Sequence, residues 1–260
     1  MRLLNGVNNI VQDFGYNCLL VPLDRVPKFK DEFAMYCRKK KIAAGIFANL
    51  SFTDDYIQAF ENIIPIVIIG SEMKNSGIVS ILSDNENGAY NATTHLLDNG
   101  HQEILLIASD LAIPDHYSRM LGYKKAMKEN NKTIREEYII SYLTQSNLEI
   151  ILEGLLSRNE NAKEKPTAAF VCDDSEVIRC MSIMEKLKIE IPKDFSIVGF
   201  DDYDFSVHLS PPLTTVRQPI SEMGEAAARI VINKINDSKY IPENTKFETS
   251  LIKRKSVKKI

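Results

Sequence analysis

Short apolar runs, each bounded by turn residues, alternate along the chain with longer segments of mixed polarity. Within each run the apolar residues are continuous rather than alternating, which is typical of strands that are buried on both faces. Such an alternation predicts parallel β-sheet covered by helices. The predicted strands lie at residues 18–23, 42–48, 66–70, 79–82, 104–108, 138–142, 168–172 and 196–200.

Segments with apolar residues at helical spacing fill the gaps between these runs. One stripe, at positions 3, 7, 10 and 11, opens the chain, and another runs from residue 220 to residue 235. At least eight strand–helix units exceed what one doubly wound sheet requires, and the strands divide into sets before and after residue 100. The pattern therefore predicts an α/β protein with two Rossmann-like lobes. A (β/α)8 barrel also needs eight alternating units, so the count alone leaves that architecture open.

The composition is that of a soluble globular protein. The 260 residues are 44% hydrophobic and 26% charged, and no apolar run approaches the roughly 18 residues that span a bilayer. The 32 Lys and Arg residues against 35 Asp and Glu residues give a formal charge of -3, which argues against binding nucleic acid by charge alone. Residues 1–20 lack the basic and apolar pattern of a signal peptide, so a cytoplasmic location is expected.

The chain lacks the common motifs of nucleotide, metal and hydrolase sites. Neither GxGxxG nor GxxxxGK[ST] nor GxSxG occurs, and the histidines form no HExxH pair. The cysteines show no CxxC spacing, and their apolar surroundings predict free buried thiols. We therefore expect no cofactor, metal or catalytic residue, and we expect the histidines at the surface or in turns. These residues are Cys18, Cys37, Cys172 and Cys180, and His95, His101, His116 and His208.

Paired carboxylates follow two of the predicted strands. Asp173 and Asp174 come directly after one strand, and Asp201 and Asp202 come directly after another. Because open α/β sheets bind ligands at the carboxyl ends of their strands, we expect Asp173 and Asp201 to contact a ligand. Asp174 precedes a helical stripe, which predicts that it caps that helix. A rival hypothesis is a Mg²⁺ site for phosphoryl transfer, but no phosphate-binding motif accompanies these acids.

Arg119 begins a helical segment shortly after the predicted strand at residues 104–108. A guanidinium at this place lies near the same sheet edge, and it can donate two parallel hydrogen bonds to vicinal hydroxyls or to a carboxylate. An ordinary arginine on a helix surface fits the residue pattern equally well.

Longer motifs run through the chain in a fixed order. The segment DNENGAY at residues 84–90 is followed by SIVGFDD at 196–202, PPLTTVRQP at 211–219 and SLIKRKS at 250–256. In these motifs, and over residues 5–256 as a whole, the chain resembles the effector-binding domain of the LacI/GalR family of bacterial transcription regulators.

This resemblance implies a periplasmic-binding-protein-like fold of two lobes that are joined by three crossovers. The first lobe would comprise residues 1–100 and 218–246, and the second residues 101–217 and 247–260. The resemblance further implies a homodimeric repressor whose lobes hold a sugar or a similar small molecule between them and couple it allosterically to operator binding. The alternative is the sugar-binding protein of a transport system, which shares this fold.

Individual site residues carry over from the family motifs. By this resemblance Arg119 contacts effector hydroxyls, and Asp173 and Asp201 are acids at the ends of their strands. Gln218 lies in the crossover after PPLTT and would line the effector site, and Asp84 would be a further ligand group. An arginine donor opposite carboxylate acceptors is the pairing that polyol recognition requires.

Two features of the family's regulators do not occur in this sequence. One is the DNA-binding helix-turn-helix head, and the other is a β-strand that precedes the first helix. An opening strand is central in a doubly wound sheet, so its loss would leave neighbouring strands unpaired. We therefore expect that residues upstream of this sequence in the full gene supply both the strand and the head that contacts operator DNA.

Overall fold

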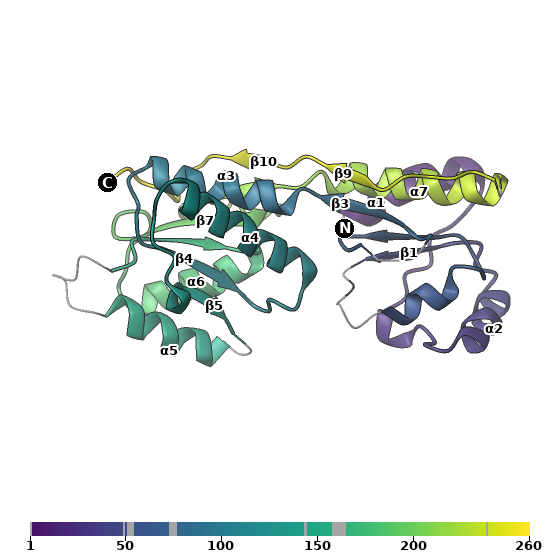
Figure 1. Cartoon of the computed structure of the whole chain (residues 1–260), viewed down its shortest axis with the longest axis horizontal. Coiled ribbons are helices and arrows are strands. Elements are labelled where there is room, and N and C mark those ends of the chain that lie inside the picture. Colours follow the sequence, from purple (N-terminus) through teal and green to yellow (C-terminus); the bar gives the residue numbers. More distant parts are fainter. Residues whose placement is uncertain are drawn as a thin grey trace. The chain divides into compact units, whose positions relative to one another are not determined.

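The computed structural model describes residues 2–48, 50, 55–72, 77–142, 145–157, 165–237 and 239–260. In it the chain forms two compact units. Unit 1 comprises Met1–Ser83 and Pro219–Phe247, and unit 2 comprises Asp84–Gln218 and Glu248–Ile260. The chain therefore passes between the units three times, and each unit is built around its own sheet (Figure 1).

Unit 1 contains a parallel sheet of four strands in the spatial order β1-β2-β3-β9. One face of the sheet packs on α2 and the 3-10 helix η3, and the other packs on α7, which α1 covers in turn. The elements are α1 (Arg2–Val11), α2 (Lys30–Lys40), β1 (Gly45–Ala48), η3 (Asp55–Phe60), β2 (Ile66–Ile69), β3 (Val79–Ser83), α7 (Ile220–Asn236) and β9 (Thr245–Phe247).

The strand predicted at residues 18–23 does not form. After α1 the chain makes the short 3-10 helix η1 (Gln12–Phe14) and then runs without regular structure to η2 (Leu23–Arg25). Leu19 and Leu20 are 59% and 79% exposed. A strand needs a neighbour for its backbone N–H and C=O groups, and in the described part of unit 1 the outer edge of β1 pairs with none. Cys18 is exposed with this segment, contrary to expectation, whereas the other cysteines are buried.

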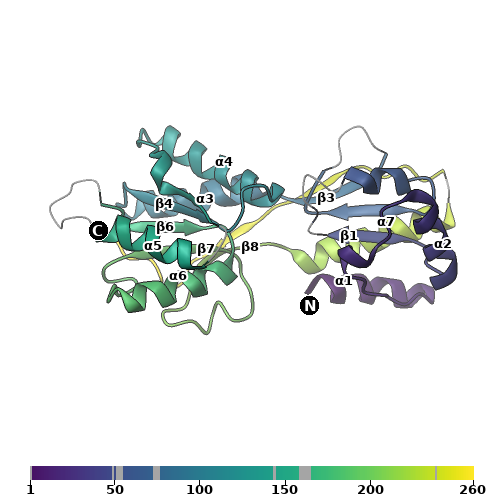
Figure 2. The same cartoon turned by 90° about the horizontal axis from the view of Figure 1, so that it is seen from below.

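Unit 2 contains a six-stranded sheet in the order β10-β8-β7-β6-β4-β5, parallel except for β10, which runs antiparallel to β8. Helices α3 and α4 cover one face, and α5 and α6 cover the other (Figure 2). The elements are α3 (Asn85–Asp98), β4 (Ile104–Ala108), α4 (Pro114–Glu129), η4 (Glu136–Tyr138), β5 (Ile139–Ser141), α5 (Gln145–Leu156), β6 (Ala168–Val171), α6 (Asp174–Lys186), β7 (Ser196–Asp201), β8 (Thr214–Arg217) and β10 (Ser250–Ile252).

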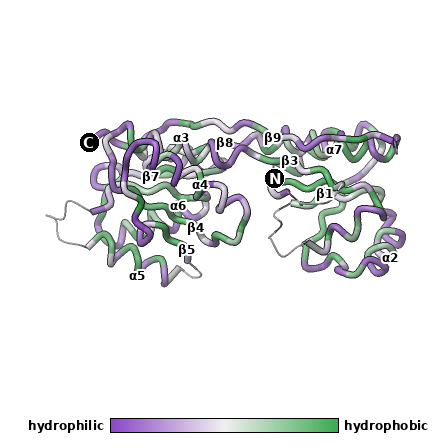
Figure 3. Tube along the Cα trace, in the orientation of Figure 1, coloured by the Kyte–Doolittle hydropathy of each residue, from purple (hydrophilic) through white to green (hydrophobic). Residues whose placement is uncertain are grey.

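The central strands of unit 2 are buried on both faces, as the continuous apolar runs predict. Leu105 and Ile107 pack toward α5 and α6, and Ile104 and Leu106 pack toward α3 and α4. Hydrophobic colours accordingly follow these strands in Figure 3. Two separate open sheets exclude the (β/α)8 barrel.

The first passage between the units follows Ser83, earlier than the position near residue 100 expected from the sequence. Helix α3 belongs to unit 2 because it packs directly on α4. The two helices approach closely at Gly122, where an added Cβ would lie 2.0 Å from the carbonyl oxygen of Glu86. Residues 84–100 therefore lie in the second unit.

Candidate functional site

Arg119 is the centre of a buried polar cluster in unit 2. Its side chain projects from the second turn of α4 and is 3% exposed. The Nε atom donates to Asn85 Oδ1 at 2.8 Å, and Nη1 donates to the carbonyl oxygen of Cys172 just beyond β6. The guanidinium lies 3.8 Å over the ring of Phe200, where a cation is attracted to the aromatic face. Contacts from α3, β6 and β7 thus fix its position.

Two carboxylates face the remaining nitrogen of this guanidinium. Arg119 Nη2 lies 3.4 Å from Asp201 Oδ1 and 3.9 Å from Asp115 Oδ2. Asp115 precedes Arg119 by four residues, which places both side chains on one face of α4. Asn85 bridges the pair, because its Nδ2 also donates to Asp115 Oδ1 at 3.0 Å. We call Asn85, Asp115, Arg119, Asp201 and Gln218 the Arg119 cluster.

Asp201 ends β7 in a backbone conformation that non-glycine residues rarely adopt, with φ of 111°. Gln218 Nε2 donates to Asp201 Oδ1 at 2.5 Å. Burial raises the pKa of Asp201 to about 8; the charge of Arg119 opposes this rise, and the charge of Asp173 adds to it. The carboxyl therefore holds its proton near neutral pH.

The following residue, Asp202, anchors this strained turn. It also has a positive φ, of 53°, and its side chain accepts hydrogen bonds from two arginines. Arg217 Nε donates at 2.7 Å and Arg254 Nη2 at 2.6 Å. Charge-assisted bonds of this kind hold the backbone that presents Asp201.

Of the two acids after β6, Asp173 caps the following helix, and Asp174, which was expected to cap it, does not. Asp173, with φ of −153°, is the N-cap of α6, and its carboxylate accepts from the backbone N–H of Ser175 at 2.6 Å. Asp174 is the first helical residue and is fully buried, where it accepts from Ser206 Oγ at 2.6 Å and Thr215 Oγ1 at 2.7 Å. The prediction that Asp174 caps the helix is wrong, because tertiary contacts to a loop and to β8 hold its side chain.

Asp84 caps α3, where its carboxylate accepts from the backbone N–H of Asn87 at 3.3 Å. The next residue, Asn85, is the one that contacts Arg119. A ligand role for Asp84 stays a prediction.

The structure thus brings Arg119, Asp201 and Gln218 together, and Asp173 lies close enough for its charge to act on Asp201. Sequence reasoning missed Asn85 and Asp115. The i, i+4 spacing of Asp115 and Arg119 was a usable signal for one of them. No local signal indicated the other, because its partner lies 34 residues away.

Two histidines are buried, contrary to expectation. His116 lies beside the Arg119 cluster with Nδ1 3.0 Å from the carbonyl oxygen of Asp110; burial and the charge of Arg119 lower its pKa, so it is neutral at pH 7. His101 is fully buried and contacts Thr167 Oγ1 at 2.9 Å and the Lys258 carbonyl at 3.1 Å. His101 therefore links the C-terminal segment at Lys258 to Thr167, the residue that precedes β6.

The described residues hold no group of three or more His, Cys, Asp or Glu side chains that could bind a metal ion. Within the same ranges, no helix combines the length and apolar character that crossing a membrane requires.

Comparisons with known proteins relate the whole chain to transcription regulators. A family profile described as a periplasmic binding protein-like domain matches residues 93–257. The HTH-type transcriptional repressor PurR of Actinobacillus pleuropneumoniae is 30% identical over 251 residues, which cover 95% of this chain and 73% of that repressor. PurR of Vibrio campbellii is 26% identical over 262 residues, which cover 100% of this chain and 77% of that repressor.

A solved structure of a LacI family transcriptional regulator from Enterococcus faecium, with bound ribose, shares the fold. Its TM-score is 0.83 at 23% identity, and the match covers 100% of this chain and 94% of that chain. The predicted α/β architecture of two lobes in a periplasmic-binding-protein-like fold is therefore confirmed.

Proposed function

Since the chain belongs to the LacI/GalR family of transcription regulators, we propose that its effector is a sugar or a similar polyol that binds at the Arg119 cluster. The observation that supports this most directly is the arrangement around Arg119 Nη2, whose carboxylate contacts of 3.4 and 3.9 Å are both longer than a normal hydrogen bond. Vicinal hydroxyls can accept from this nitrogen and donate to the acids beside it.

In this proposal Arg119 is the donor, Asp201 and Asp173 are acceptors, and Gln218 orients Asp201. Asp84 is a further ligand group. The ribose in the Enterococcus faecium regulator supports a sugar as the class of effector.

The PurR relatives are transcriptional repressors, which favours a regulator over the sugar-binding protein of a transport system and over an enzyme. For this chain we propose a cytoplasmic repressor without a cofactor. It would contact operator DNA through a helix-turn-helix head outside these 260 residues.

A thermal-shift screen of sugars, nucleobases and sugar phosphates tests the effector class. A ligand present at 100 times its dissociation constant adds about 2.7 kcal/mol to the free energy of unfolding. If no sugar or related polyol raises the melting temperature, the proposed effector class is wrong.

Substitution of Arg119 tests the site. Arg119→Ala removes a charge-assisted donor and should cost about 1.5–3 kcal/mol of affinity for the sugar that the screen identifies. Calorimetry on the variant measures this loss, and Asp98→Asn on the exposed end of α3 serves as a control for a change of surface charge. Unchanged affinity of Arg119→Ala would place the effector elsewhere.

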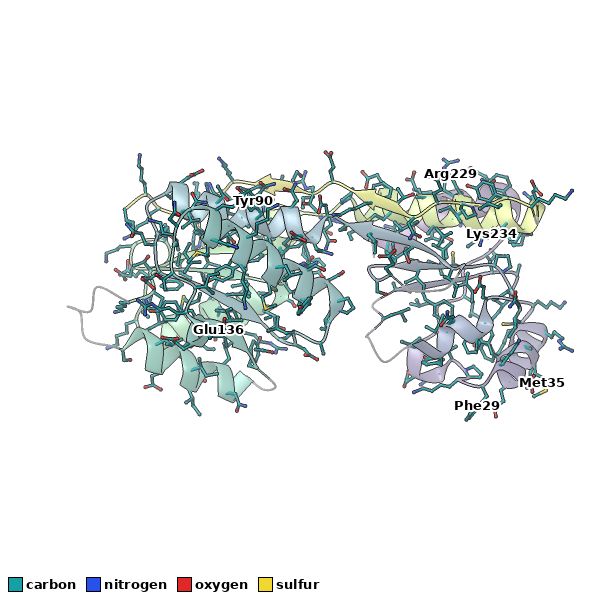
Figure 4. All side chains as sticks on the ribbon, viewed as in Figure 1. Phe29, Met35, Tyr90, Glu136, Arg229 and Lys234 are labelled. Atoms are coloured by element: carbon teal, nitrogen blue, oxygen red, sulfur yellow. The ribbon has the colours of Figure 1, made fainter. Side chains whose placement is uncertain are left out.

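We also propose that the protein is a homodimer. The described part of each unit exposes large apolar side chains, and burial against a second copy would remove this surface from water. In unit 1 these include Phe29 and Met35 beside and on α2 (Figure 4), and in unit 2 they include Ile178 and Val207. Sedimentation at micromolar concentration distinguishes a dimer from a monomer, and a monomer would contradict this proposal.

A further inference from the structure

The charged groups of the Arg119 cluster differ in their access to solvent. The side chains of Arg119 and Asp201 are 3% and 9% exposed, whereas that of Asp115 is 28% exposed. Asn85 and Gln218 are buried as well. Among these three ionisable side chains, that of Asp115 is therefore the most accessible to a ligand in solvent.

Asp115 also keeps a hydrogen-bond acceptor for a ligand. Its Oδ1 atom accepts from Asn85 Nδ2 at 3.0 Å, but its Oδ2 atom lies 3.9 Å from Arg119 Nη2. That separation gives an ion pair and not a hydrogen bond. A ligand hydroxyl placed beside both groups would donate to Oδ2 and accept from Nη2.

The charges around this position are unbalanced. One cation, Arg119, faces the carboxylate of Asp115, and the negative charge of Asp173 acts on the same place, whereas Asp201 holds its proton near neutral pH. His116 adds no positive charge at pH 7, because burial and Arg119 lower its pKa. Arg217 and Arg254 both donate hydrogen bonds to Asp202, so the charge of that acid offsets part of theirs.

Further negative charge is disfavoured in such surroundings. Burial raises the pKa of Asp115 as well as that of Asp201, against the opposing charge of Arg119. A phosphate or carboxylate on the ligand would lose its hydration and would be repelled by the negative charges of Asp115 and Asp173.

We propose that Asp115 makes the effector site selective for an uncharged polyol and excludes the phosphate ester or carboxylic acid derived from it. This inference rests on the proposed function, because it assumes that the effector binds at the Arg119 cluster. Asp115 acts as the acceptor for a ligand hydroxyl and as the source of repulsion against an anion.

Matched ligand pairs test the selectivity. Ribose and ribose 5-phosphate, and glucose and glucose 6-phosphate, are titrated by calorimetry into the wild-type protein and into Asp115→Asn and Asp98→Asn. In the wild type the neutral member should bind more than about tenfold tighter than its phosphate, a difference of about 1.4 kcal/mol. Asp115→Asn should reduce this preference for the neutral sugar by roughly tenfold, because it removes the negative charge that repels the phosphate. Asp98→Asn removes one negative charge outside the cluster and should leave the preference unchanged.

The outcomes separate this inference from the proposed function. A sugar phosphate that binds the wild type tighter than its neutral partner overturns the selectivity but leaves the effector site in place. The same conclusion follows if Asp115→Asn has the wild-type ratio of affinities for the neutral sugar and its phosphate. If no member of either pair binds, or if binding survives in Arg119→Ala, the sugar site and this inference are both overturned. Should Asp115→Asn not fold, Asp115→Ser provides the same loss of charge.

Discussion

Two adjacent acids, Asp201 and Asp202, form a turn at the end of β7, and their carboxyl groups bind different partners. Asp201 faces Arg119 and Gln218, and Asp202 binds Arg217 and Arg254. Both have positive φ, a conformation that costs energy for a residue with a Cβ atom. Their side-chain partners stabilise this backbone and direct one carboxyl toward the candidate site.

The raised pKa of Asp201 predicts a dependence of stability on pH. In the folded state this carboxyl keeps its proton up to a pKa of about 8, whereas its ordinary pKa is 3.8. Between these values the folded state binds more protons than the unfolded state, so the free energy of unfolding falls as pH rises through this window. Asp201→Asn removes that contribution.

Denaturant unfolding at pH 5 and pH 8 measures the effect. The wild type should lose roughly 3–4 kcal/mol relative to Asp201→Asn between these two pH values, since each pH unit in this window corresponds to about 1.4 kcal/mol. Burial also raises the pKa of Asp174 to about 6, and this carboxyl is present in both proteins. Parallel pH profiles for the two proteins would contradict the assignment.

At the scale of elements, each unit contains a pair of helices in close contact through glycine. In unit 1 an added Cβ at Gly6 of α1 would lie 2.1 Å from the carbonyl oxygen of Ser221. In unit 2 an added Cβ at Gly122 of α4 would lie 2.0 Å from the carbonyl oxygen of Glu86 in α3. Backbone-to-backbone contact of this kind brings the Asn85 end of α3 within reach of Arg119.

Gly122→Ala is therefore expected to separate α3 from α4. Overpacking of this kind costs on the order of 1–3 kcal/mol, and the displacement should also weaken effector binding. Thermal or denaturant unfolding measures the loss. The control is Gly154→Ala in α5, where an added Cβ meets nothing within 4 Å and alanine should stabilise the helix by up to about 1 kcal/mol. Equal effects of the two substitutions would contradict close packing at Gly122.

At the scale of the whole molecule, the chain connects the two units at residues that contact the candidate site. Gln218, the last residue of unit 2 before the second passage, bonds Asp201, and its neighbour Arg217 bonds Asp202. A ligand that engages Asp201 therefore acts close to the segment that enters unit 1. Allosteric coupling requires that the ligand interact differently with the two conformational states of the regulator.

A regulator that joins this chain to the proposed DNA-binding head should thus show reciprocal coupling. A saturating effector is expected to change operator affinity by about 5- to 150-fold, which corresponds to about 1–3 kcal/mol. Operator DNA must change effector affinity by the same factor, which provides an internal check. Fluorescence anisotropy with labelled operator, with and without effector, measures the first factor, and calorimetry measures the second. Equal operator affinities in both states would contradict a regulatory role for this site.

The sequence by itself determined where most strands lie and which of their ends carry acids. A strand buried on both faces must be apolar without interruption, so β4, β6 and β7 were recognisable as local runs, and Asp173 and Asp201 followed them at the sheet edge. The position of Arg119 after β4 made it a candidate ligand contact, and the resemblance to the family motifs then favoured that role over an arginine on the helix surface.

Only the tertiary structure decided what those elements and acids do. The apolar run at residues 18–23 forms no strand without a neighbour to pair with, and Asp174 is held by Ser206 and Thr215 instead of capping its helix. Asn85 reaches Arg119 because α3 packs on α4, which also places α3 in the second unit. Each of these outcomes depends on a partner distant in sequence, and a local pattern of residues contains no information about which partner will be near.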